Sequence, residues 1–154
     1  MVKDHLAEAN ELFRSGLNCS QAIVAVFSEE HGFPAETAIK IAYPFGRGMG
    51  GCGHTCGALT GALMVIGMKY GTADRYEPDK MKLAREKTRR LFELFEAEHG
   101  TTLCNDLTGL DQRKLNAVSY TPLRAHETPE HLVCRLLLDK KNIQTDERIT
   151  ATLI

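Results

Sequence analysis

Residues 44–70 read PFGRGMGGCGHTCGALTGALMVIGMKY, a glycine-rich segment that leads directly into the longest apolar stretch of the chain. Six of the chain's thirteen glycines lie within residues 44–57, and this density predicts a loop because glycine weakens both helices and strands. The apolar residues that follow are too few to span a membrane and end at Lys69, so they predict a buried central helix from Cys56 to Tyr70. Small residues would let neighbouring backbones approach this helix closely: Gly57, Ala58, Gly61, Ala62 and Gly67.

Helical patterns also cover the part of the chain before this loop. Apolar residues recur at helical spacing in residues 4–14, and Gly16 marks the end of that helix. Asn18, with Gln21 three positions later, has the pattern of a capping box for a second helix that starts at Cys19 and runs to about residue 30. A short helix is expected at residues 35–42.

After the loop, residues 79–99 form the clearest amphipathic helix, which Gly100 ends. Thr128 and Pro129 predict the start of a last helix that carries Cys134. The segment 101–121 and the tail 142–154 show no clear pattern. The apolar side of the amphipathic helix consists of Met81, Ala84, Thr88, Leu91, Phe92 and Phe95.

Strand signals are weak throughout the sequence. We therefore expect an all-α fold, a compact single-domain bundle of about five or six helices over residues 1–154, in which a glycine-rich loop precedes the buried central helix. With 43% hydrophobic residues, a chain of 154 residues can bury a core of its own. The cysteines are therefore not needed as structural cross-links.

The overall charge and composition argue against several classes of partner. The formal net charge is −1, whereas binding to nucleic acid or to an anionic membrane favours a clustered positive excess. A small molecule or another protein is the expected partner. The opening residues MVKDHLAEANELF are charged and amphipathic, unlike a signal peptide, so we expect a cytoplasmic protein with reduced thiols. The histidines form neither an HExxH motif nor the spacing of a hydrolase triad.

Five cysteines are the main candidates for chemistry: Cys19, Cys52, Cys56, Cys104 and Cys134. Cys56 and Cys19 are expected at helix starts, where backbone amides and the helix dipole stabilise a thiolate. Cys104 is expected in a loop, and Cys134 lies among apolar residues of the predicted last helix. The competing interpretation is that these cysteines are small buried hydrophobic residues.

The segment Cys52-Gly53-His54-Thr55-Cys56 is a C-x3-C motif with an internal histidine, which could ligate zinc or another soft metal. No second closely spaced pair of cysteines accompanies it, so a zinc ribbon is not expected. His54 is better interpreted as a solvated loop residue, or as a hydrogen-bond donor near a thiolate, than as a ligand.

Residues 46–51 also match GxGxxG, but no strand precedes them, so a dinucleotide-binding turn is not expected. Glycine here would instead bring the main chain close to a cofactor or to a packed neighbour, with Arg47 either supplying charge or lying on the surface. The candidate cofactor-binding residues are Gly48, Gly51, Gly53 and Gly57.

The segment LNCSQAIVAVF around Cys19, the run GRGMGGCGHTCGALTGALMVIG, and the single cysteines at positions 104 and 134 together resemble the C-GCAxxG-C-C family of redox-active proteins. Agreement covers most of residues 15–136, and the cysteine pattern is also similar to the non-haem part of split-Soret cytochromes. The resemblance implies a small redox protein with a prosthetic group such as an iron–sulfur cluster. By this resemblance, the four cysteines of the family pattern correspond to Cys19, Cys56, Cys104 and Cys134.

Two features depart from the family pattern. Cys52 is a fifth thiol, which could replace Cys56 as a metal ligand or form a local disulfide with it. The tail 142–154 does not continue the final helix as the family pattern would require, which affects the expected C-terminal packing and any oligomer contact.

Our leading hypothesis is an electron carrier that holds a [2Fe–2S]-type cluster on Cys19, Cys56, Cys104 and Cys134 and exchanges electrons with a redox protein partner. Amides of the glycine loop and helix starts would donate hydrogen bonds to sulfur. The alternatives are a metal-free thiol–disulfide oxidoreductase with Cys56 or Cys19 as the catalytic thiol, a structural zinc site, and a helical interaction module. Whether the protein is an enzyme stays open, and a homodimer is expected.

Overall fold

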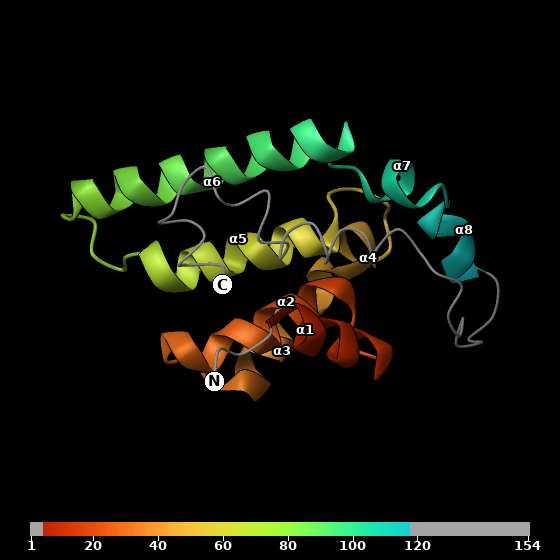
Figure 1. Ribbon diagram of the computed structural model, residues 1–154, viewed down its shortest axis with the longest axis horizontal. Coiled ribbons are helices and arrows are strands. Elements are labelled where there is room, and N and C mark those ends of the chain that lie inside the picture. Colours follow the sequence, from red (N-terminus) through yellow and green to blue (C-terminus); the bar gives the residue numbers. More distant parts are fainter. Residues whose placement is uncertain (1–4, 118–154) are drawn as a thin grey trace.

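The computed structural model describes residues 5–117 of the chain, and these residues fold into helices (Figure 1). Within them the β-structure is limited to one isolated antiparallel bridge between Thr55 and Leu103. The all-α prediction is confirmed. The elements are α1 (His5–Arg14), α2 (Cys19–Ser28), the 3₁₀ turn η1 (Glu29–His31), α3 (Ala35–Ala42), η2 (Tyr43–Phe45), α4 (Gly46–Met49), α5 (Gly57–Tyr70), α6 (Pro78–His99), α7 (Cys104–Thr108) and α8 (Gln112–Ala117).

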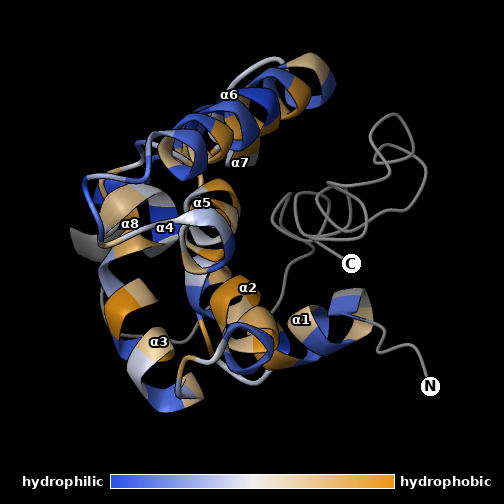
Figure 2. Ribbon diagram, turned by 90° about the vertical axis from the view of Figure 1, so that its left-hand side faces the viewer, coloured by the Kyte–Doolittle hydropathy of each residue, from blue (hydrophilic) through white to orange (hydrophobic). Residues whose placement is uncertain are grey.

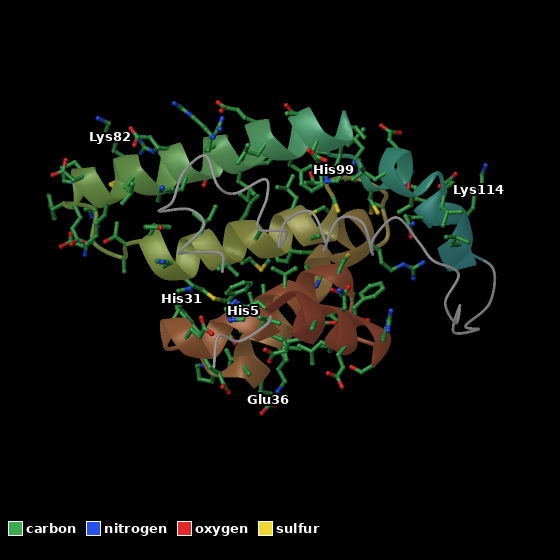
Figure 3. All side chains as sticks on the ribbon, in the orientation of Figure 1. His5, His31, Glu36, Lys82, His99 and Lys114 are labelled. Atoms are coloured by element: carbon green, nitrogen blue, oxygen red, sulfur yellow. The ribbon has the colours of Figure 1, made fainter. Side chains whose placement is uncertain are left out.

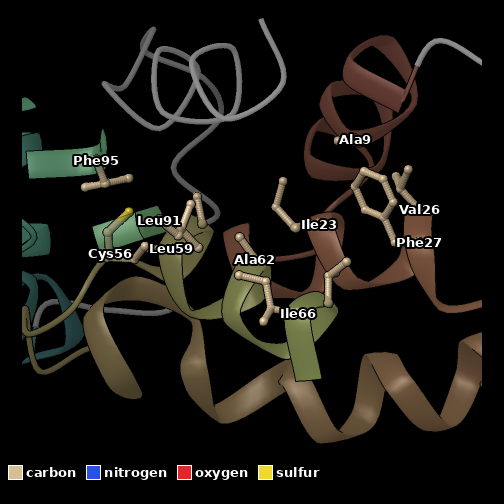
Figure 4. Close-up of a cluster of buried hydrophobic side chains, with 12 residues drawn as sticks. Ala9, Ile23, Val26, Phe27, Cys56, Leu59, Ala62, Ile66, Leu91 and Phe95 are labelled. Atoms are coloured by element: carbon tan, nitrogen blue, oxygen red, sulfur yellow. The ribbon is translucent and has the colours of Figure 1, made fainter. Parts of the chain in front are cut away.

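Helix α5 lies in the middle of the molecule, between the long α6 on one side and α1, α2 and α3 on the other (Figure 1). Orange, apolar residues are frequent on α2 and α5, whereas blue, polar residues are frequent on α6 (Figure 2). Leu59 and Val65 of α5 are completely buried, as the prediction of a buried central helix requires. The main core cluster joins Ala9, Ile23, Val26, Phe27, Cys56, Ala58, Leu59, Ala62, Val65, Ile66, Leu91 and Phe95 (Figure 4).

Two glycines of α5 allow α2 to pack directly against its backbone. A Cβ atom at Gly61 would lie 2.9 Å from the Ser20 carbonyl oxygen and 3.1 Å from Ile23 Cβ, and one at Gly57 would overlap the sulfur of Cys19. The predicted close approach is therefore present at both positions. At Gly67, no heavy atom of the described residues lies within 4 Å of a built Cβ, so within this part of the chain the predicted close approach is absent there.

The ends of the long helices follow the capping signals in the sequence. Asn18 caps α2 with the full capping box, its side chain accepting from the Gln21 amide while the Gln21 side chain accepts from the Asn18 amide. Gly100 ends α6 in the left-handed conformation, with φ of 74°. In the described part of the chain, no helix is long and apolar enough to cross a membrane.

The structure corrects the prediction for Cys104, which begins helix α7 and does not lie in a loop. Helix α8 follows it closely, in a segment where the sequence shows no helical pattern. Both helices are too short to display an amphipathic period. The predicted last helix with Cys134 and the tail 142–154 lie outside the described residues.

Candidate functional site

Three cysteines from distant parts of the sequence stand at helix starts around the glycine-rich loop. Cys19 is the first residue of α2, Cys56 is the N-cap of α5, and Cys104 is the first residue of α7. Their exposed fractions are only 2%, 3% and 2%, whereas Cys52 is exposed. Figure 3 draws sulfur atoms at the end of the molecule where α4, α5 and α7 meet.

Cys19 and Cys56 are neighbours because glycine follows Cys56. The Cys19 sulfur lies against the backbone of Gly57, at a position where any larger residue would place its own Cβ. Gly46 of the loop approaches the same point, since its Cα lies 3.1 Å from that Cβ position. The loop therefore packs directly against both helix starts.

Cys104 contacts the opposite part of the same loop. A Cβ at Gly48 would lie 2.7 Å from Cys104 Cβ and 2.7 Å from Gly53 Cα. Gly48 also has a φ of 70°, which an L-residue with a side chain seldom adopts. Gly48 thus brings the loop and the start of α7 into direct contact.

A short antiparallel pairing places Cys56 opposite Thr102 and Cys104 opposite His54. The Cys104 amide donates a hydrogen bond to the His54 carbonyl oxygen at 2.6 Å, and the Cys56 amide donates one to the Thr102 carbonyl oxygen at 2.8 Å. These bonds flank the bridge between Thr55 and Leu103. They connect the segment before α5 to the segment before α7.

The element α4 is a left-handed turn. Arg47, Gly48, Met49 and Gly50 have φ values of 54°, 70°, 66° and 66°, and the Gly50 amide donates to the Gly46 carbonyl oxygen at 3.0 Å. The left-handed conformation costs a residue with a side chain about 1–2 kcal/mol, and it applies here to Arg47 and Met49. In this turn the Arg47 amide donates a hydrogen bond to Cys19 Sγ at 3.4 Å.

A family model described as "Putative redox-active protein (C_GCAxxG_C_C)" matches residues 17–147, most of the chain. The chain belongs to this family. Membership supports a redox role for the protein, and the match includes the three buried cysteines and the glycine-rich loop. No curated protein and no solved structure matches the chain.

The glycines predicted to bind a cofactor lie at close backbone contacts with protein groups. Gly48 contacts Cys104, Gly53 is covered by the side chain of Asn105, and Gly57 contacts Cys19. Gly51 is buried, with a φ of 80°. The sequence left a cofactor and a packed neighbour open as reasons for these glycines, and at three of them the structure shows a packed neighbour.

The other polar residues of the loop lie at the surface. His54 is exposed, and its Nε2 lies 3.4 Å from a guanidinium nitrogen of Arg113. Arg47 is exposed as well, although its Nε donates to Gln112 Oε1 at 3.3 Å. Cys52 is exposed, in contrast to the three buried cysteines.

The donor atoms around the loop have the chemistry that an iron–sulfur cluster requires, because thiolates are its usual ligands. Among residues 5–117, however, no three His, Cys, Asp or Glu side chains already form a group arranged to hold a metal ion. The fourth family cysteine, Cys134, lies outside the described residues. The three buried thiols are donors of the type that a thiolate-ligated group takes.

Two asparagines support the site: the sequence predicted Asn18 only as a helix cap, and it did not single out Asn105. Asn18 directly precedes Cys19 and covers Gly46, whereas Asn105 directly follows Cys104 and covers Gly53. The Asn18 side chain also donates to the Tyr43 carbonyl oxygen at 2.9 Å. An asparagine next to a cysteine at two separate helix starts is a pattern visible in the sequence.

Proposed function

We propose that this chain is an electron carrier whose redox centre is an iron–sulfur cluster ligated by Cys19, Cys56 and Cys104 together with Cys134. The observation that carries this proposal is the convergence of three buried cysteines on one glycine-rich loop, each from a different helix start. A [2Fe–2S]-type cluster would supply one-electron exchange, and four thiolates are the usual ligand set. The family's redox role is consistent with this assignment.

Burial favours electron transfer over chemistry at an exposed thiol. A thiolate that attacks another molecule must be accessible, whereas Cys19, Cys56 and Cys104 are at most 3% exposed. Electrons can reach a centre beneath a thin protein layer without direct contact between sulfur and the partner. A redox protein is therefore the partner that we propose.

The chain's own groups would stabilise the negative charge of such a centre. Cys19 and Cys56 stand at the positive ends of helices of 10 and 14 residues, where the helix dipole favours an anion. The Arg47 amide already donates to the Cys19 sulfur. Hydrogen bonds to sulfur raise the reduction potential of a cluster, because they favour the state that carries the extra electron.

The test is anaerobic purification followed by visible absorption and iron and sulfide analysis. We expect a coloured protein with about two iron and two sulfide per chain. Replacing Cys19, Cys56 or Cys104 with serine should abolish the colour, whereas the exposed Cys52→Ser serves as the matched control and should retain it. Colourless, iron-free protein under these conditions, or loss of colour only in Cys52→Ser, would overturn the assignment.

The contact between Cys19 and the residue after Cys56 favours a second candidate, a thiol–disulfide oxidoreductase. In that reaction the thiolate of Cys56 or Cys19 attacks a disulfide of the substrate and forms a mixed disulfide. The second cysteine then resolves it, and the substrate leaves as a dithiol while this chain keeps a new disulfide. Thiol counting on metal-free protein distinguishes the candidates, because this reaction requires a reversible loss of two thiols.

A further inference from the structure

Gln112 is a buried polar residue at the start of α8, and it contacts both sides of the candidate site. Only 3% of the residue is exposed. Its Oε1 accepts a hydrogen bond from Arg47 Nε at 3.3 Å, and its Nε2 donates to Thr108 Oγ1 at 3.4 Å. Thr108 in turn donates to the Cys104 carbonyl oxygen at 2.8 Å. Gln112 thereby links the helix of Cys104 to the left-handed turn.

The backbone of Gln112 is fixed as well. Its amide donates to Asn105 Oδ1 at 3.0 Å, and the Asn105 amide donates to the Gly53 carbonyl oxygen at 3.2 Å. The side chain of Asn105 covers Gly53. The position of Gln112 is therefore set by the same loop that it contacts through Arg47.

The left-handed conformation of Arg47 is unfavourable by itself, so contacts with other residues must stabilise it. Its φ of 54° is unfavourable for a residue with a side chain, and its side chain reaches Gln112 from this conformation. In the same conformation its amide points at Cys19 Sγ, 3.4 Å away. The Arg47 amide shares a peptide plane with the Gly46 carbonyl, which the left-handed turn fixes through the hydrogen bond from the Gly50 amide. Unwinding this turn would release that plane and with it the bond from the Arg47 amide to the sulfur.

We propose that Gln112 is a positioning residue of the redox centre: by accepting the hydrogen bond from Arg47, it holds the left-handed turn so that the Arg47 amide stays on the Cys19 sulfur. This inference rests on the proposed function, because the proposed function assigns Cys19 to a redox centre. The contacts themselves involve only residues of this chain.

The test measures amide hydrogen exchange by NMR in the full-length, reduced, metal-free protein. Gln112→Met preserves the size of the side chain and removes the acceptor, so the Arg47 amide should exchange about tenfold faster, as expected for the loss of one hydrogen bond. Gln112→Glu retains an acceptor oxygen and should restore slow exchange. Cys19→Ala removes the sulfur and should also accelerate exchange at Arg47.

Ser28→Ala is the matched control, because Ser28 is completely buried at the far end of α2. It should leave exchange at Arg47 unchanged. Unaltered exchange at Arg47 in Gln112→Met would overturn the proposal. Equal acceleration of Arg47 and of core amides such as Leu59 would also overturn it, since Gln112 would then serve only global stability. The measurement needs no metal, so iron-free protein would contradict the proposed cluster without deciding this result.

Discussion

At the scale of single residues, the surroundings of a glycine determine whether the missing side chain is needed for close packing. Gly57 and Gly67 lie on the same helix, yet Gly57 touches the Cys19 sulfur, whereas Gly67 has open space around its Cα. The sequence predicted that the small residues of this helix let a neighbouring backbone approach, but it could not distinguish these two glycines. The distinction depends on which face of α5 meets α2, and that is a property of the folded chain.

The two glycines give opposite predictions for the same substitution. Gly57→Ala should lower the free energy of unfolding by about 1–3 kcal/mol, because the added methyl group overlaps Cys19. Gly67→Ala should raise it by about 0.5–1 kcal/mol, since alanine is the better helix former and meets nothing. Urea denaturation measures both. An unchanged stability of Gly57→Ala would contradict the contact with Cys19.

Among the candidate site residues, the sequence identified Cys19 and Cys56 correctly as helix-start cysteines, because Asn18 and the glycine loop are local signals. It placed Cys104 in a loop, because five helical residues carry no period. It could not show Gln112 or Asn105 at the site, because their roles depend on contacts between segments far apart in the sequence.

At the scale of elements, the start of α2 is the best-predicted part of the fold. Asn18 forms the capping box with Gln21, and it also accepts a hydrogen bond from Ser20 Oγ at 2.8 Å. Its amide group donates to the Tyr43 carbonyl oxygen, so the cap joins α2 to the turn before the glycine loop. One side chain therefore supports both a helix and the loop beside it.

Asn18→Ala should lower the free energy of unfolding by about 1–2 kcal/mol through loss of the cap. Asn18→Asp retains the acceptor for the Gln21 amide and loses only the donor to Tyr43, so its loss should be smaller. Thermal denaturation of the two variants against wild type measures the difference. An equal loss in the two variants would contradict the cap, since the bond to Tyr43 alone would then account for the effect of Asn18.

Helix α6 ends at a histidine that makes stability depend on pH. Burial lowers the pKa of His99 below its ordinary value of 6.5, an effect that Glu98 partly opposes. His99 also packs on Phe95, with ring centroids 4.5 Å apart. At the end of η1, burial and then the charge of Lys69 lower the pKa of His31, against the opposing charge of Glu30.

The unfolded chain binds a proton at these histidines more readily than the folded chain. Their contribution to stability is therefore present above pH 6.5 and is lost as the pH falls from 6.5 towards the lowered pKa values. We expect the urea midpoint of wild type to decrease over this range. The urea midpoint of His99→Gln should decrease less steeply with falling pH. An identical slope in the two proteins would contradict the role of His99.

At the scale of the whole molecule, the packing of α2, α5 and α6 holds the site in place. Leu59 is completely buried in this core and lies in the first turn of α5, directly after the N-cap residue Cys56. The sequence could predict the central helix and the apolar side of α6, because both are long periodic patterns. It could not predict that the loop before α5 pairs with the segment before α7.

Leu59→Ala should lower the free energy of unfolding by about 2–5 kcal/mol through the cavity that it leaves. Leu83 of α6, 39% exposed, offers the matched control, and Leu83→Ala should change stability by no more than about 0.5 kcal/mol. Guanidinium denaturation followed by circular dichroism compares the two. Equal losses would contradict the central position of α5.

The left-handed turn at Arg47 and Met49 predicts how the chain would respond to D-amino acids at these two positions. Its backbone is close to the mirror image of an ordinary helical turn, so the enantiomer of each natural residue would adopt it without steric conflict. A chemically synthesised chain with D-arginine at position 47 or D-methionine at position 49 should therefore be more stable by about 1–2 kcal/mol per exchange. The same exchange inside a right-handed helix such as α6 would disrupt it.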